Sequence, residues 1–210
     1  MKLALTLGSL STVLATVAAQ AEMIKFTENL AIPIGNPVGI YPAGVVSTIP
    51  ANYRITDLTV GLEVSGGFNG GLVAYVEAPD GSTVSLLNRP GVTDGNPFGY
   101  CGSGLNVSIF DAATASLQTT PEAFGQVVTG NYQAIGSLAS FNGLPGNGTW
   151  NLYIADDLVG GGQPMLDSWS LDITAVPTPE PSQLLAGAVL VGGALGVGLL
   201  RRRVGARKEI

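Results

Sequence analysis

The sequence predicts an all-β body, a sandwich or barrel of antiparallel strands, between two apolar terminal segments. Three observations predict this organisation. The 210 residues include 30 Gly and 13 Pro, and 46% are apolar whereas only 11% are charged, a composition typical of a turn-rich β protein or of one with membrane segments. Apolar residues in the middle of the chain recur at every second position. Both ends instead contain continuous apolar runs beside basic residues.

The first 21 residues are typical of a secretory signal peptide. Met1 and Lys2 give a short basic start, an apolar run follows, and Ala19-Gln20-Ala21 supplies the small residues after which signal peptidases cut. A buried N-terminal helix is the alternative, but these residues show no polar face. We therefore expect cleavage at Ala19–Ala21 and a mature chain that begins near Glu22, outside the cytoplasm.

Residues 22–176 are predicted to form one β domain. Successive side chains of a strand face opposite sides, so alternating apolar and polar residues give one buried face and one exposed face. Three runs show this pattern: 58–64, 105–109 and 150–154. Pro79-Asp80-Gly81 and Asn142-Gly143 supply turns between strands. Trp150 and Trp169 lie in phase with the apolar positions, which predicts that both pack in the core.

Charge and histidine content exclude several classes of function. Residues 22–176 hold 13 carboxylates but only three basic residues, a net charge of −10 that disfavours nucleic acid and anionic lipid as partners. The chain has no histidine, so Ser-His-Asp and Cys-His mechanisms and histidine zinc sites are excluded. Cys101 is the single cysteine and forms neither a metal cluster nor an internal disulfide. Paired carboxylates for glycosidase chemistry remain, but Asp156 and Asp157 are adjacent and would point to opposite sides of a strand.

The C-terminal segment, residues 177–210, has three parts in a fixed order. Pro179-Glu180-Pro181 comes first, and residues 184–200 are 17 uncharged, mostly apolar positions, the lower limit for a helix that spans a bilayer of about 30 Å. Arg201, Arg202 and Arg203 then end the span, which predicts a cytoplasmic tail and an external body.

This arrangement resembles the PEP-CTERM sorting signal of Gram-negative bacteria. The resemblance implies an exosortase-type enzyme that recognises the Pro-Glu-Pro segment and removes the helix. It further implies transient anchoring in the inner membrane, followed by transfer of the body to the cell surface or to an exopolysaccharide matrix.

A second resemblance covers residues 55–174. The segments GGLVAYVEAPDGSTVSLL, FNGLPGNGTWNLYIADDLVGGG and LDSWSLDI are similar to the P domain (P/Homo B domain) that follows the catalytic domain of subtilisin-like proprotein convertases. The resemblance implies a jelly-roll-like antiparallel β-sandwich. Residues 66–72 depart from the family pattern, because they lack its histidine and its Gly-Asp-Leu. The roughly 30 residues between the signal peptide and this pattern are too few for a protease domain.

The loop between the Trp150 and Trp169 strands contains the candidate metal ligands. Asp156, Asp157 and Asp167 lie in a Gly-rich stretch that is longer than a usual hairpin turn. Three carboxylates and backbone oxygens would suit calcium, which takes six to eight oxygen ligands. The alternative is that Asp156 and Asp157 bond to turn amides and that Asp167 positions the next strand. No other cofactor is expected.

The sequence is compatible with two functions. The first is a non-catalytic surface or exopolysaccharide-associated protein sorted by an exosortase-type system. The second is a detached accessory P domain that assists a separately encoded subtilisin-like serine endopeptidase.

Overall fold

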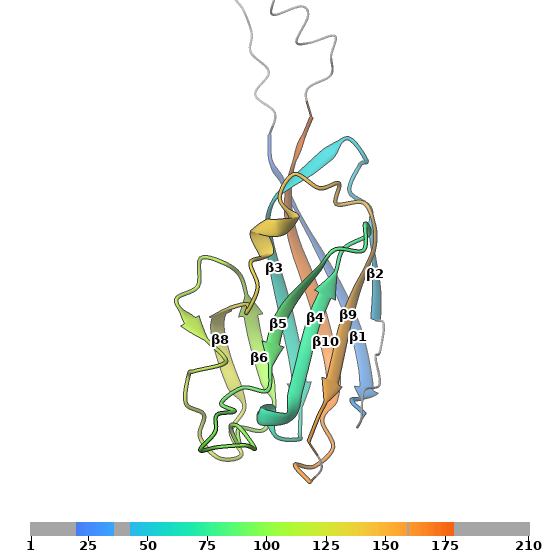
Figure 1. Ribbon diagram of the computed structural model, residues 1–210. Coiled ribbons are helices and arrows are strands. Elements are labelled where there is room, and N and C mark those ends of the chain that lie inside the picture. Colours follow the sequence, from blue (N-terminus) through green and yellow to red (C-terminus); the bar gives the residue numbers. More distant parts are fainter. Residues whose placement is uncertain (1–19, 36–42, 159, 179–210) are drawn as a thin grey trace, which may run out of the picture.

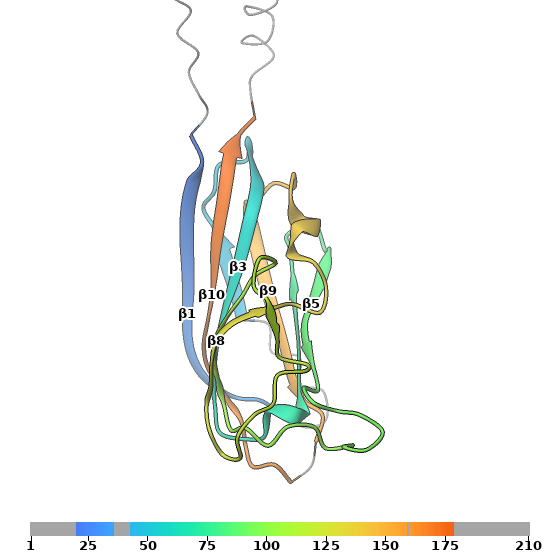
Figure 2. The same cartoon turned by 90° about the vertical axis from the view of Figure 1, so that its left-hand side faces the viewer.

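The computed structural model describes residues 20–35, 43–158 and 160–178, which form a two-layered β-sandwich (Figures 1 and 2). One layer has six strands in the order β1-β10-β3-β6-β8-β7, and the other has four in the order β2-β9-β4-β5. The elements are β1 (Glu22–Pro33), β2 (Ala43–Ser47), β3 (Tyr53–Ser65), η1 (Asn69–Gly71), β4 (Leu72–Glu77), β5 (Thr83–Asn88), β6 (Leu105–Ile109), β7 (Ala115–Ser116), β8 (Val128–Gln133), η2 (Leu138–Phe141), β9 (Gly148–Asp156) and β10 (Met165–Pro177).

The all-β prediction is confirmed, but the expectation of a wholly antiparallel arrangement is wrong. Both β6 and β7 pair with β8 in parallel, whereas the other strand pairs are antiparallel. The chain between β6 and β8 runs back along the sandwich and includes the two-residue β7, and this crossover makes the β6–β8 pairing parallel.

The core forms between the inner faces of the two sheets. Alternate residues of β3, from Leu58 to Val64, are buried, as their period of two predicts. The prediction for the two tryptophans is also confirmed, since Trp150 and Trp169 are 0% and 1% exposed. The indole of Trp150 donates to the Gly146 carbonyl at 3.1 Å and meets the ring of Phe141 edge-on. Burying such side chains contributes roughly 1.5–3 kcal/mol each.

Both ends of the described chain leave the sandwich at the same pole. β1 and β10 are antiparallel neighbours, and Glu22 lies opposite Ala175 (Figures 1 and 2). The loops that carry the candidate site gather at the opposite pole, which we call the loop end: residues 66–71, 89–104, 117–127 and 157–164, of which residue 159 is not described.

The described residues contain no helix with the length and apolarity needed to cross a membrane. Ala21 is exposed and directly precedes β1. Residues 1–19, which include Ala19, lie outside the described residues, as do the Pro179-Glu180-Pro181 motif, the predicted span at 184–200 and the arginine cluster.

Candidate functional site at the loop end

Asp156 ends β9 as a buried carboxylate. It is 4% exposed, lies opposite Leu72 of β4, and accepts a hydrogen bond on Oδ1 from the Leu158 backbone N–H at 3.1 Å. Gly71 makes room for it, because a Cβ at position 71 would overlap Oδ1 of Asp156.

Burial raises the pKa of Asp156, and the neighbouring negative charge of Asp157 raises it further. The hydrogen bond from the Leu158 N–H stabilises the ionised form and opposes that shift. This hydrogen bond to a turn amide is the role that the sequence analysis gave Asp156 as the alternative to metal binding.

The other two predicted calcium ligands have different surroundings. The side chain of Asp157 is 51% exposed, and its Oδ2 lies 3.9 Å from Nη1 of Arg89. Asp167 is the extra residue of a bulge in β10, between Leu166 and Ser168. Within the described ranges, no three acidic or cysteine side chains come together as a cation site. Calcium binding by Asp156, Asp157 and Asp167 therefore stays a prediction.

Asn69 is the residue that sequence reasoning missed. It is fully buried in η1, and its side chain joins three segments of the loop end. Its Nδ2 donates to the Gly104 carbonyl at 3.1 Å and to Oε2 of Glu122 at 2.9 Å, and its Oδ1 accepts from the Gly104 N–H at 3.0 Å. The sequence signal for it was weak, an asparagine that precedes two glycines.

Glu122 is the acidic partner of Asn69. Burial raises its pKa, while the hydrogen bonds from Asn69 and from the Gly102 backbone oppose that effect. Its second oxygen, Oε1, is buried and has no hydrogen-bond partner among the described residues. Burial of an oxygen without a hydrogen-bond partner therefore disfavours the charged form of Glu122 relative to a carboxylate in water.

Arg89 holds the longest loop in place. Its backbone has φ +50°, a left-handed conformation that is uncommon outside glycine, and its N–H donates to the Leu72 carbonyl at 2.7 Å. Its Nη2 donates to the Pro97 carbonyl at 2.9 Å. The guanidinium thus fastens the far side of the 89–104 loop to the end of β5.

The loop end encloses an apolar hollow of about 330 Å³, lined by Phe68, Phe98, Cys101, Leu158, Gly160 and Gly161. Cys101 is partly exposed and unpaired. The phenyl ring of Phe124 lies against that of Phe68, with centroids 5.8 Å apart. No carboxylate is among the lining residues, so the hollow suits binding of an apolar group rather than acid–base chemistry.

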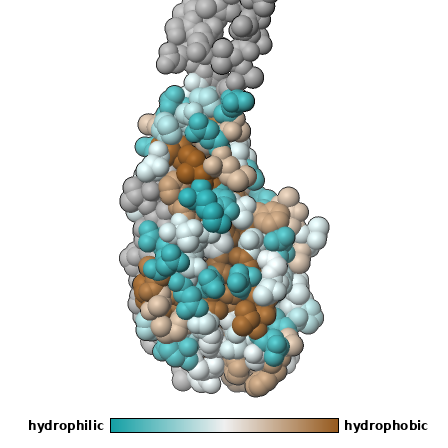
Figure 3. All heavy atoms as spheres, turned by 180° about the vertical axis from the view of Figure 1, so that it is seen from behind, coloured by the Kyte–Doolittle hydropathy of each residue, from teal (hydrophilic) through white to brown (hydrophobic). Residues whose placement is uncertain are grey.

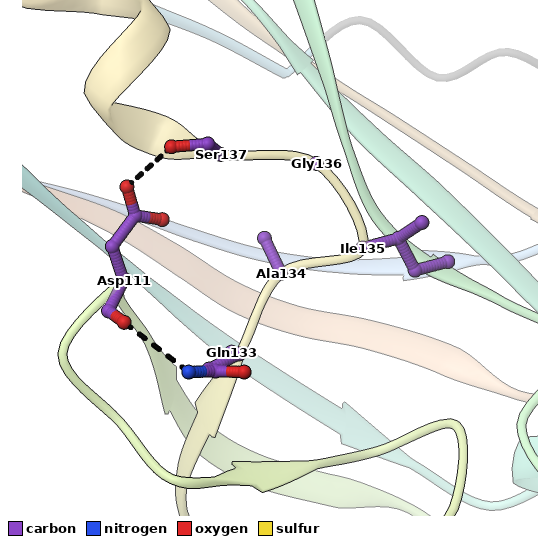
Figure 4. A pocket seen from close by; sticks show the side chains of 6 residues that line it. All are labelled: Asp111, Gln133, Ala134, Ile135, Gly136 and Ser137. Carbon is purple, nitrogen blue, oxygen red and sulfur yellow. Dashed lines mark hydrogen bonds between the residues drawn. The ribbon is translucent and has the colours of Figure 1, made fainter.

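A second, more open hollow of about 270 Å³ lies beside η2 (Figure 4). The Asp111 carboxylate there accepts from the Ser137 hydroxyl at 2.7 Å and from the backbone N–H groups of Leu138 and Ala139 at 2.9 and 2.7 Å. Burial raises the pKa of Asp111, but these three donors outweigh burial and lower it overall. Since both carboxylate oxygens are occupied at the start of η2, Asp111 fixes this helical turn and is not free for catalysis.

No family model matches the sequence, and no curated protein matches it. The crystal structure of the serine protease of Aeromonas sobria is similar, with a TM-score of 0.46 and 15% identity over 77% of this chain and 28% of that chain. The complex of the Aeromonas sobria protease with the chaperone ORF2 is similar at a TM-score of 0.45 and 17% identity, over 76% and 28%. The chain thus spans 28% of the length of those proteins, and no family or activity follows from similarities of this size.

Proposed function

We propose that this protein is a non-catalytic β-sandwich that is exported and then sorted to the cell surface or to an exopolysaccharide matrix by an exosortase-type system. The observation that carries the proposal is that the described chain begins and ends at one pole of an acidic sandwich, where Glu22 lies opposite Ala175. A signal peptide before Glu22 and a sorting segment after Val176 would then attach side by side. The loop end would face away from the inner membrane while the tail still holds the chain there.

Two observations support the non-catalytic assignment: the composition of the chain and the hydrogen bonding of the carboxylates at the loop end. The sequence has no imidazole to activate a serine or cysteine. Glu122 is bonded to Asn69, and Asp156 is bonded to Leu158. Neither is among the described residues that line the hollow at the loop end, where the acid and base of a glycosidase would have to meet a substrate.

The test of this proposal combines fractionation with an activity assay. The proposal predicts that the protein is found in the envelope or the medium and that the purified protein does not hydrolyse peptide substrates. Turnover that a serine-reactive inhibitor abolishes would overturn the non-catalytic assignment. Recovery of the protein in the cytosol alone would overturn export.

The second candidate is an accessory P domain for a separately encoded subtilisin-like protease. A specific contact favours the P-domain resemblance: a Cβ at Gly148, the first residue of the Gly-Thr-Trp motif, would stand 2.7 Å from Cβ of Pro79 in the Pro-x-Gly turn. Two motifs that are about 70 residues apart in the sequence therefore pack together, which gives a physical reason for their pairing. A gene for a protease without its own P domain beside this gene would favour the accessory role, whereas genes for polysaccharide synthesis would favour the first function.

A further inference from the structure

The loop end carries most of the large apolar side chains that the described residues leave exposed. Six such side chains are exposed, and four of them belong to two loops of this pole, 89–104 and 117–127: Val92, Phe98, Phe124 and Val127, at 37, 66, 77 and 54%. Figure 3 shows tan spheres at the end of the molecule remote from the termini. Scattered apolar residues are normal on a surface, but a cluster on adjacent loops indicates an interaction site. We call this cluster, with Phe68 and Leu158, the apolar tip.

The two loops are joined by backbone hydrogen bonds. The Gly125 N–H donates to the Cys101 carbonyl and the Ser103 N–H donates to the Gln126 carbonyl, both at 2.8 Å. These bonds bring the segments that carry Phe98 and Phe124 together around Phe68. The two loops of the apolar tip are therefore joined to each other, and the ring of Phe124 lies against that of Phe68.

The hollow in the apolar tip is kept open by glycine. A Cβ at Gly161 would stand 3.1 Å from Cβ of Phe68, and Gly160 has φ +105°, which other residues rarely adopt. A cavity of about 330 Å³ accommodates one large apolar side chain of a partner.

Polar contacts hold the loops that surround the hollow. Besides the Asn69 and Arg89 bonds, the Asn96 amide donates to the Gly91 and Gly99 carbonyls at 3.1 and 2.9 Å. These bonds fix the loop on both sides of Phe98. A surface that is ordered before binding loses less conformational entropy when a partner docks, which favours affinity.

The rim of the apolar tip is acidic. Asp94 is exposed between Val92 and Phe98, and Asp157 is half-exposed beside Leu158. Arg89 is the one basic residue of these loops, and it is bonded to the Pro97 carbonyl and lies close to Asp157. The net charge of −10 between residues 22 and 176 further opposes a second copy of the chain or an anionic membrane. Charge complementarity therefore favours a partner with positive charge.

From this geometry we infer that the apolar tip is a docking site for a protein segment that carries a large apolar side chain flanked by lysine or arginine. The apolar side chain enters the hollow between Phe68, Phe98 and Leu158, and the basic residues face Asp94 and Asp157. This inference goes beyond the proposed function, because it holds for either of the two candidate roles. Residues 20 and 178, the first and last that the structure describes, lie at the other pole, remote from the apolar tip.

The test begins with a displayed library of random peptides, selected on the full chain and counter-selected on a Phe98→Ser/Phe124→Ser variant. Both phenylalanines are largely exposed, so the double variant should fold normally. We expect enriched peptides to combine an aromatic or large aliphatic residue with Lys or Arg. The double variant should bind them at least about tenfold more weakly, as for other interface anchors.

Ile135→Ser is the matched control. Ile135 is 50% exposed but lies between β8 and η2, away from the apolar tip, so its loss should leave peptide binding unchanged. Asp94→Lys should weaken binding and reduce its dependence on salt.

Cys101 supplies an independent readout. It is the single cysteine of the chain and lines the hollow, so a bound peptide should slow its reaction with a thiol reagent.

Four results would overturn the inference: enriched peptides without basic residues, equal binding to the double variant, no peptide enrichment at all, or unchanged Cys101 reactivity. Phe-dependent binding to phosphatidylcholine vesicles or to a neutral polysaccharide, without peptide binding, would assign the apolar tip to lipid or sugar instead. Loss of export would refute the proposed function and would leave this result standing.

Discussion

Replacement of Asn69 by alanine removes the side chain that joins three segments of the loop end. Three hydrogen bonds disappear, two with the backbone of Gly104 and one with the carboxylate of Glu122. Gly104 is buried and Glu122 is partly buried, and leaving a buried polar group without its partner costs about 1–3 kcal/mol. Water that enters the vacated space recovers part of this cost, so we expect a net loss of about 3–5 kcal/mol in the free energy of unfolding.

A loss of this size is measurable and severe. Domains of this length lose about 2–4 °C in melting temperature per kcal/mol, so the midpoint should fall by about 6–20 °C. Urea denaturation at pH 7, followed by circular dichroism, gives the free-energy difference directly. Asn131→Ala is the control, because Asn131 is exposed on β8 and its loss should cost no more than about 0.5 kcal/mol. A loss below about 1 kcal/mol for Asn69→Ala, or equal losses for the two variants, would refute the reasoning.

The remaining predictions concern charge, metal binding and processing. Glu122→Gln should stabilise the protein at pH 7, because burial raises the pKa of Glu122 and so disfavours its charged form in the folded state. The gain in stability should shrink as the pH falls through the folded-state pKa and vanish below the ordinary value of 4.5. Equal melting temperatures of the two proteins at pH 7 would contradict this prediction. If Asp156, Asp157 and Asp167 bind calcium, a chelator should lower the melting temperature and Asp156→Ala should abolish that sensitivity, whereas identical melting with and without chelator would discard the calcium site. Changing Pro179, Glu180 and Pro181 to alanine should trap a longer, membrane-held form, visible on immunoblots of the membrane fraction; normal release would show that this motif is not the processing signal.

Local sequence patterns predicted the strands whose side chains alternate. Leu58–Val64 of β3 and Trp150–Ile154 of β9 have one fully buried face, and a period of two is visible without any partner strand. The parallel pairing of β6 with β8 was not predicted, because pairing direction depends on the path of the chain between the strands.

The loop end was predicted only in part. Asp156 and Asp157 mark the end of β9, and Asp156 does accept a hydrogen bond from a turn amide. The Asn69 contacts join residues 35 and 53 positions apart, and the hollow combines Phe68, Phe98 and Leu158 from three separate loops. Such contacts follow from tertiary structure and leave no periodic signal in the sequence.

Mass spectrometry of the intact protein isolated from the envelope or the medium tests most directly that an exported sandwich is processed at both ends. Export and sorting predict an N-terminus close to Glu22 and a C-terminus within residues 177–210, without the arginine cluster. A mass that corresponds to all 210 residues, in protein found only in the cytosol, would contradict the account.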